Sequence, residues 1–187
     1  MNRRELRSQY LRVNRKFEVL YAPKVRKALH VKVQAVIENL KEGGYQYAIS
    51  KLSTEIGNVE LSEVVRKLYT DVGLRHARLT YRRIVVDQKK GFGFNLEWTK
   101  FITDYLNRFL LEKITFEVAN TTRNALLKAL TAGIALGWGV DGMVNQLEHW
   151  PFERYQAARI VRTEVNRASN VGSAAQESTS EYEQQKE

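Results

Sequence analysis

Residues 98–110 read Trp-Thr-Lys-Phe-Ile-Thr-Asp-Tyr-Leu-Asn-Arg-Phe-Leu, and this stretch carries the clearest periodicity in the chain. Its apolar side chains recur at i, i+3, i+4 and i+7, the spacing that lines one face of an α-helix. The stretch therefore predicts an amphipathic helix that turns seven side chains toward a core: Trp98, Phe101, Ile102, Tyr105, Leu106, Phe109 and Leu110.

The same period predicts two helices upstream. Apolar residues recur from residue 25 to residue 40, and Gly43-Gly44 is expected to end that helix because glycine readily adopts the conformation of a helix stop. A second amphipathic pattern covers residues 61–79. Helical periodicity thus dominates the first half of the chain.

Three further helices are expected downstream. One begins at residues 121–122, both threonine, and ends at residues 137–139, Gly-Trp-Gly. A short helix capped by Asp141 reaches Leu147, and Pro151 takes the first position of a last helix. The apolar face of the last helix comprises Tyr155, Ala158, Val161, Val165 and Ala168. We predict an all-α fold, an elongated multi-helix body with a basic N-terminal helical arm and a C-terminal helical unit.

Composition excludes several classes of protein. With 187 residues, 43% of them apolar, the chain can build the core of one or two domains, so wholesale disorder is excluded. The absence of cysteine excludes disulfide scaffolds, iron–sulfur clusters and thiol chemistry, and fits a reducing compartment. No apolar run reaches the ~18 residues of a membrane span, and no apolar stretch follows the charged start, so neither a membrane partner nor a signal peptide is expected.

Positive charge is concentrated at the N-terminus. Residues 1–34 hold ten basic and two acidic residues, which is +8 of the formal +9. Such a segment suits a polyanion or an acidic protein surface, and a solvated helix face is the simplest alternative. Whether this arm folds alone or only on its partner stays open. The candidate contact residues in the arm are Arg3, Arg4, Arg7, Arg12, Arg15 and Lys16.

Little in the sequence indicates chemistry. The three histidines lack the spacing of a helical metal site, and no nucleophile motif occurs, so we expect no catalytic residue, no metal and no cofactor. Residues 89–94, Lys-Lys-Gly-Phe-Gly-Phe, place Lys89 and Lys90 beside glycines that would let a phosphate approach the backbone. A connector between two helices is the simpler interpretation of that loop.

Residues 157–172 carry a motif that resembles a known family. They contain Arg162-Thr163-Glu164, then Arg167-Ala168, Asn170 and Gly172, in the register A-x-x-I-A-R-T-E-x-x-R-A-x-N-x-G. This pattern is similar to the closing motif of the phage head morphogenesis family, the MuF-like minor capsid proteins of tailed phages. Val161 replaces the small alanine of the family pattern. The order of Thr122, the glycine-rich turn at residues 137–142 and Leu147 is also similar.

The resemblance implies a minor capsid protein that binds the portal vertex during procapsid assembly. It implies the phage portal protein as partner, with the scaffold or major capsid protein and double-stranded DNA as further candidates. It also implies a place in the virion, at the capsid interior or portal vertex, after assembly in the host cytoplasm. We expect four segments: a basic arm at 1–44, a central region at 45–120, a MuF-like unit at 121–178 and a flexible acidic tail at 179–187, with fraying from Ser173 onward.

The motif itself is expected to hold helices together. Arginine and glutamate at these spacings most often form an ion-pair network within the chain, and small residues such as Gly172 permit close helix packing. A portal contact is the alternative role for Arg162, Thr163, Glu164, Arg167 and Asn170. No catalytic domain is expected after the motif, so we predict a binding protein and not an enzyme.

A second function class remains open on the residues alone. Arg75, Arg78, Arg82 and Arg83 follow one another on the helix predicted around residues 61–79. Together with the basic arm they would neutralise phosphates in a nucleic-acid-binding protein that has no portal role.

Overall fold

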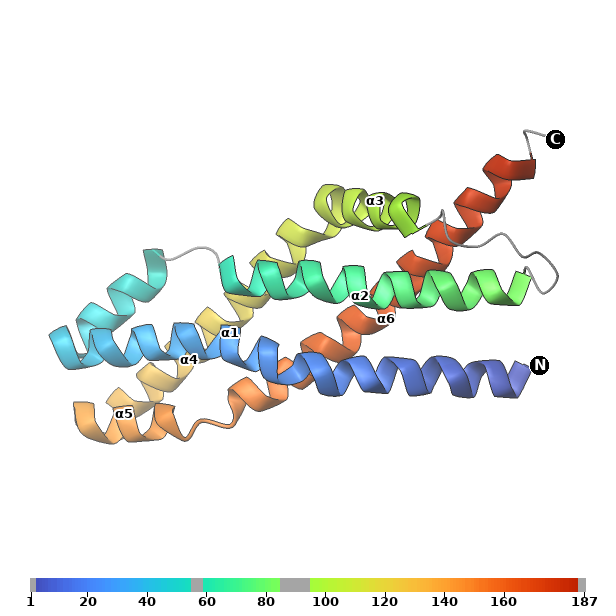
Figure 1. The fold of residues 1–187 in the computed structure, drawn as a ribbon. Helices are drawn as coiled ribbons and strands as arrows, with labels where there is room; N and C mark the ends of the chain where they lie inside the picture. Colours follow the sequence, from blue (N-terminus) through green and yellow to red (C-terminus); the bar gives the residue numbers. More distant parts are fainter. Residues whose placement is uncertain (1–2, 55–58, 85–94, 185–187) are drawn as a thin grey trace.

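The computed structural model describes residues 3–54, 59–84 and 95–184, and it confirms the all-α prediction. The described segments form an elongated bundle in which α1 and α2 run alongside each other while α4 and α6 cross them obliquely (Figure 1). None of the helices in these three segments is long and apolar enough to cross a membrane. The elements are α1 (Arg3–Thr54), α2 (Val59–Ile84), α3 (Asn95–Tyr105), η1 (Leu106–Leu110), α4 (Leu111–Ala135), α5 (Val140–Glu148) and α6 (Phe152–Gln184).

Helix α1 is much longer than the sequence pattern predicts. Helical backbone extends from Arg3 through Pro23 and is interrupted at Gly44, where φ is +72°. A second helical stretch then continues to Thr54. Gly44 therefore ends the first helix as expected, because a left-handed φ is accessible to glycine at no steric cost, but helix resumes at once.

The larger part of the core joins α1, α2 and α6. Tyr21 and Leu29 of α1, Leu68 of α2, and Val161 and Val165 of α6 are almost fully buried in one cluster. Helices α2 and α6 cross at two glycines: a Cβ on Gly172 would lie 2.1 Å from the carbonyl oxygen of Gly73. This contact confirms that Gly172 permits close helix packing.

A second cluster closes the other end of the molecule. There the last turns of α1 before Gly44 pack against α4 and the short helix α5. Val36, Leu40, Leu130, Met143 and Leu147 are among its buried side chains. Ala48 and Leu52 belong to the same cluster, so it takes side chains from both sides of Gly44.

The stretch that begins at Trp98 is helical, but it does not keep one register. Residues 106–110 form a π-turn, η1, between α3 and α4. Trp98, Ile102 and Leu106 are buried as predicted, whereas Tyr105 is 37% exposed, against the prediction, and Phe109 is 62% exposed. A π-turn accommodates an extra residue per turn and so shifts the apolar face. The prediction that Phe109 faces the core is therefore wrong.

Two predicted helix starts are also wrong. Helix α4 begins at Leu111, ten residues before the paired threonines, and the Thr122 hydroxyl donates to the Val118 carbonyl at 2.8 Å instead of opening a helix. Helix α5 forms where expected, but its N-cap is Gly139, and Asp141 lies in its first turn without capping it. The helix stop at Gly137 is confirmed, with φ of +70°.

The last helix differs from its predicted pattern at both ends. Tyr155 is 73% exposed and Ala158 is exposed, because α6 turns Glu153 and Ala157 inward. At the other end α6 continues to Gln184, and Ala175 and Gln176 are buried. The expectation that the chain frays from Ser173 onward is wrong, because this part of α6 packs into the core.

Candidate functional site

The N-terminal third of α1 presents a row of cations to solvent. Arg4, Arg7, Arg12, Arg15 and Lys16 are all exposed, and the neighbouring helix α2 adds the exposed Arg75. Among the residues that the structure describes, no ion pair involves any of these six. We call these six residues the basic face. Arg3 also lies in α1, but its side chain is outside the described part of the chain.

Two adjoining grooves give the basic face its shape. The larger, about 550 Å³, lies where α1 meets Arg75 of α2 and is lined by Gln9, Arg12, Val13, Arg15, Lys16, Val19 and Arg75. The smaller, about 380 Å³, runs along α1 alone and is lined by Arg4, Arg7, Ser8, Leu11, Arg12 and Arg15. None of these lining residues is a carboxylate. The grooves share Arg12 and Arg15 and therefore form one continuous surface.

Polar contacts with α2 and α6 fix another side of α1 to the bundle. Asn14 donates from Nδ2 to Oδ1 of Asn166 on α6 at 2.9 Å and accepts from Nε2 of His76 on α2 at 2.8 Å. The Tyr21 hydroxyl donates to Asp71 of α2 at 2.5 Å. This part of α1 is consequently one of the core helices.

His76 is fully buried. Desolvation, with a smaller contribution from Arg75, lowers the pKa of His76 to about 4. Its ring lies 4.6 Å from that of Tyr10, whose hydroxyl is 2.8 Å from the Thr80 hydroxyl. The histidine is neutral near pH 7, so it serves as a hydrogen-bond donor within the core.

The C-terminal motif contributes mainly to packing. Glu164 is buried, and it accepts from the Tyr69 hydroxyl of α2 at 2.8 Å and from Arg167 at 2.8 Å. Burial raises the pKa of Glu164, while the hydrogen bonds from Tyr69 and Arg167 oppose that shift. This arrangement matches the expected ion-pair network within the chain.

The other motif residues divide between surface and core. Arg162, Thr163 and Asn170 are exposed on α6, away from the buried Gly172. Thr163 and Arg167 line a polar groove of about 210 Å³ between α4 and α6, which reaches Glu164. The motif does not join the basic face, since none of its residues lines either basic groove.

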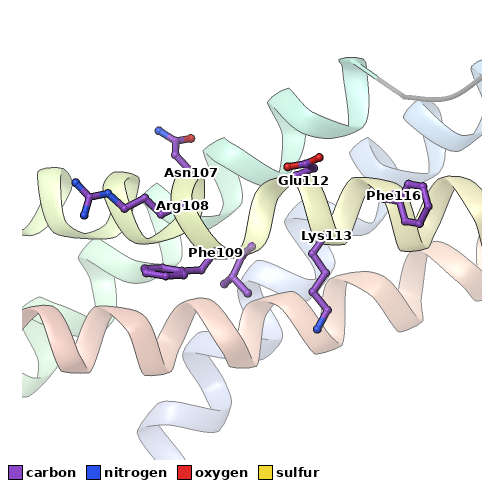
Figure 2. Close-up of a pocket in the computed structure, with 7 residues that line it drawn as sticks. Asn107, Arg108, Phe109, Glu112, Lys113 and Phe116 are labelled. Atoms are coloured by element: carbon purple, nitrogen blue, oxygen red, sulfur yellow. The ribbon is translucent and has the colours of Figure 1, made fainter.

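A fourth groove lies at the π-turn. Asn107, Arg108 and Phe109 of η1 and Glu112, Lys113 and Phe116 of α4 surround about 380 Å³ (Figure 2). Phe109 and Phe116 are more than half exposed, and the Phe109 ring lies 5.3 Å from that of Tyr105. Arginine, lysine and glutamate are mixed here, so the groove has no dominant charge.

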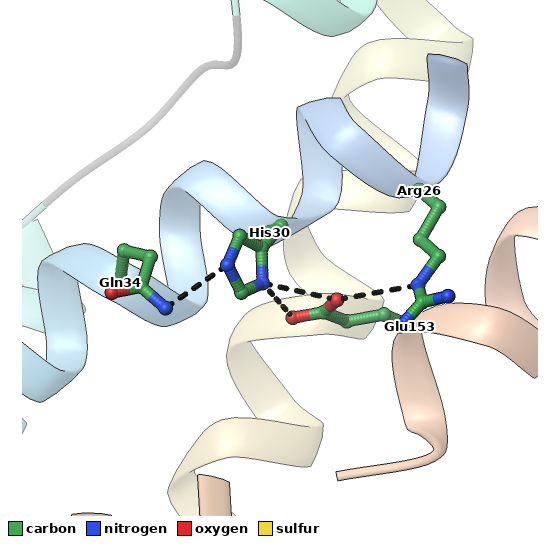
Figure 3. A network of polar contacts seen from close by, with 4 residues as sticks. All are labelled: Arg26, His30, Gln34 and Glu153. Atoms are coloured by element: carbon green, nitrogen blue, oxygen red, sulfur yellow. Dashed lines mark hydrogen bonds and ion pairs between the residues drawn. The ribbon is translucent and has the colours of Figure 1, made fainter. Parts of the chain in front are cut away.

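A buried carboxylate also joins the start of α6 to α1. His30 donates from Nδ1 to Glu153 at 2.9 Å and accepts from Gln34 at 3.0 Å, and Arg26 approaches the same carboxylate at 3.9 Å (Figure 3). Glu153 is only 5% exposed, so these partners offset the cost of burying its charge. The network links helices and provides no open coordination site.

Sequence reasoning found most of the basic face and missed what positions it. Asn14, His76 and Asn166 carry no sequence signal, because they are far apart along the chain and of common polar types. Lys89 and Lys90 lie outside the described residues, so their proposed phosphate contact is not placed. Within segments 3–54, 59–84 and 95–184, no cluster of three or more potential metal ligands occurs.

Comparison with known proteins adds no relative. No protein-family model, no curated protein and no solved structure matches this chain.

Proposed function

We propose that this chain is a minor capsid (head morphogenesis) protein of a tailed phage or prophage, and that it binds the portal vertex through the basic face. The observation that carries the proposal is the set of six exposed cations, five on the core helix α1 and one on α2, none of them in an ion pair within the described residues. The motif resemblance at residues 162–172 supplies the protein class.

The geometry supports binding through electrostatic complementarity. Unpaired cations on a face without lining carboxylates attract an acidic surface and accelerate the encounter with it. In the chain alone, hydrogen bonds of Asn14 and Tyr21 join α1 to α6 and α2. A preorganised helix loses less conformational entropy on binding than a disordered arm would.

The C-terminal motif has a separate role in this proposal. Glu164 and Gly172 hold α6 against α2, and α2 presents Arg75 to the basic face. The motif therefore maintains the scaffold on which the contact surface lies. The scaffold or major capsid protein and packaged DNA remain further candidate partners.

Co-purification tests the proposal. The tagged chain is mixed with the portal protein encoded by the same phage, at low and at high salt. We expect a stoichiometric complex that R12Q/R15Q/K16Q weakens at least about tenfold, as expected for loss of several charge contacts. The control K41Q/K100Q/K128Q removes three exposed lysines elsewhere and should bind normally. Absence of a portal complex with wild-type chain would refute the proposal.

Nucleic-acid binding is the second candidate, and the six cations of the basic face favour it. Six cations that each neutralise one phosphate would give a slope of log K against log salt of about −5. Strong DNA retention with that slope, together with no portal complex, would replace the first proposal with this one.

A further inference from the structure

We propose that the occupant of the groove lined by Val13, Val19 and Arg75 is an acidic amphipathic helix of the partner protein, and not a nucleic acid. The inference deepens the proposed function and rests on it. It specifies the kind of segment that the portal, or another capsid partner, would place against the basic face.

Exposed apolar side chains on the outer side of α1 are the first support for the inference. Val19, in the larger groove, is 71% exposed, and Leu11, in the adjoining smaller groove, is 59% exposed. The two residues lie eight positions apart on α1. Eight residues span about two turns, or ~12 Å. An amphipathic helix also carries apolar side chains two turns apart. Such a helix could therefore place its apolar side chains against both residues.

The cations around these apolar side chains are the second support. Arg12, Arg15 and Lys16 come from α1 and Arg75 comes from α2, so cations surround Val19 on two helices. No carboxylate is among the lining residues of the groove. A helix with acidic residues beside its apolar stripe complements both properties at once.

The same lining disfavours a phosphate backbone. A polynucleotide that covered Val19 would place charged oxygens against an apolar side chain and gain nothing from burying it. Contacts limited to the cations would leave Val19 in water. A protein helix removes the apolar surface from water and pairs the cations, so it uses the whole lining.

Binding of designed peptides to the full chain tests the inference. The first probe is a fluorescein-labelled helical peptide of about 20 residues with leucines at heptad a and d positions and glutamates beside them. The second has the same composition in scrambled order, and the third is a short DNA duplex. We expect the amphipathic peptide to bind at least about tenfold more tightly than the scrambled one, because burial of the apolar stripe adds to charge attraction.

A matched pair of valine substitutions makes the test specific. V19S should weaken the amphipathic peptide about tenfold and leave DNA binding unchanged, because serine removes apolar burial without altering charge. V59S is the control, since Val59 is 72% exposed and lies on α2 outside the groove. Equal binding of the two peptides, or no effect of V19S, would overturn the inference.

The outcomes separate this inference from the proposed function. If the portal complex forms but is insensitive to V19S, the portal binds by charge alone, and the inference fails while the function stands. If the amphipathic peptide binds as expected and the portal does not, the groove has the proposed specificity and the portal assignment fails.

Discussion

Helix α6 approaches the backbone of α2 at Gly73 so closely that residue 172 has no space for a side chain. A Cβ on Gly172 would lie 2.1 Å from a backbone oxygen, which cannot move without displacing α2. Arg75 of the basic face lies on α2 two residues beyond Gly73, so this contact also determines where the face lies.

Gly172→Ala should lower the free energy of unfolding by about 3 kcal/mol or more, because the methyl group forces the two helices apart. Gly142→Ala is the matched control, since Gly142 is helical and its Cβ would meet nothing closer than 3.8 Å. That variant should be neutral or stabilised by about 0.5 kcal/mol. Urea unfolding measures the stability of both variants. Equal stability of the two would contradict the close contact between α2 and α6 at Gly172.

Buried His76 predicts a specific dependence of stability on pH. Its pKa of about 4 in the folded chain lies below its usual 6.5, so the unfolded state binds the proton more readily. The stabilising contribution is therefore present above pH 6.5 and is lost as the pH falls toward 4. From pH 7 to pH 5 the loss is about 2 kcal/mol.

His76→Gln should remove that loss. The difference in unfolding free energy between wild type and variant is expected to shrink by about 2 kcal/mol from pH 7 to pH 5. Glu164 titrates in both proteins and cancels from the comparison. A difference that stays constant with pH would show that residue 76 is not buried as the structure has it.

Glu164 tests the interpretation of the motif. Glu164→Leu leaves the Tyr69 hydroxyl and Arg167 without their acceptor, so it should lower the melting temperature and cost about 3 kcal/mol. Glu164→Gln keeps an acceptor and should cost less. An unchanged melting temperature in the leucine variant would instead favour a contact role for the motif.

At the scale of elements, periodicity predicts which segments are helical, but it does not predict everywhere which side of the helix packs against the core. The apolar repeat from residue 98 indicates a helix correctly. The π-turn at residues 106–110 depends on how α3 and α4 pack, and no single residue type signals it. The start of α4 was misplaced for a related reason: threonine suits a helix opening, yet Thr122 can also bond back to its own helix.

A pair of alanine variants tests this change of register. Ile102→Ala, at a fully buried position, should cost about 2–5 kcal/mol through the cavity it leaves. Phe109→Ala should cost less than about 1 kcal/mol, because that ring is mostly exposed. Chemical denaturation measures both, and a large cost at Phe109 would restore the continuous apolar face predicted by the sequence.

At the scale of the whole molecule, the basic segment is a core helix with one charged side. Composition alone identifies Arg12, Arg15 and Lys16 as candidate contacts, because their concentration near the N-terminus is visible without a structure. The nucleic-acid alternative already groups Arg75 with the arm, but only the packing of α1 on α2 places it in the same groove as Arg12 and Arg15. Composition also does not reveal that Asn14 and Tyr21 fix the helix, because burial of scattered polar residues follows from tertiary structure.

Hydrogen exchange of the chain, alone and bound to the portal, tests the central claim most directly. In the free chain, the amides of residues 13–29 should exchange as slowly as those of α2 and α6, because these three helices share one core. Addition of the portal should slow exchange further at residues 4–19 and around Arg75. Fast exchange at residues 13–29 in the free chain, or new protection at residues 162–172 without any in α1, would contradict the account.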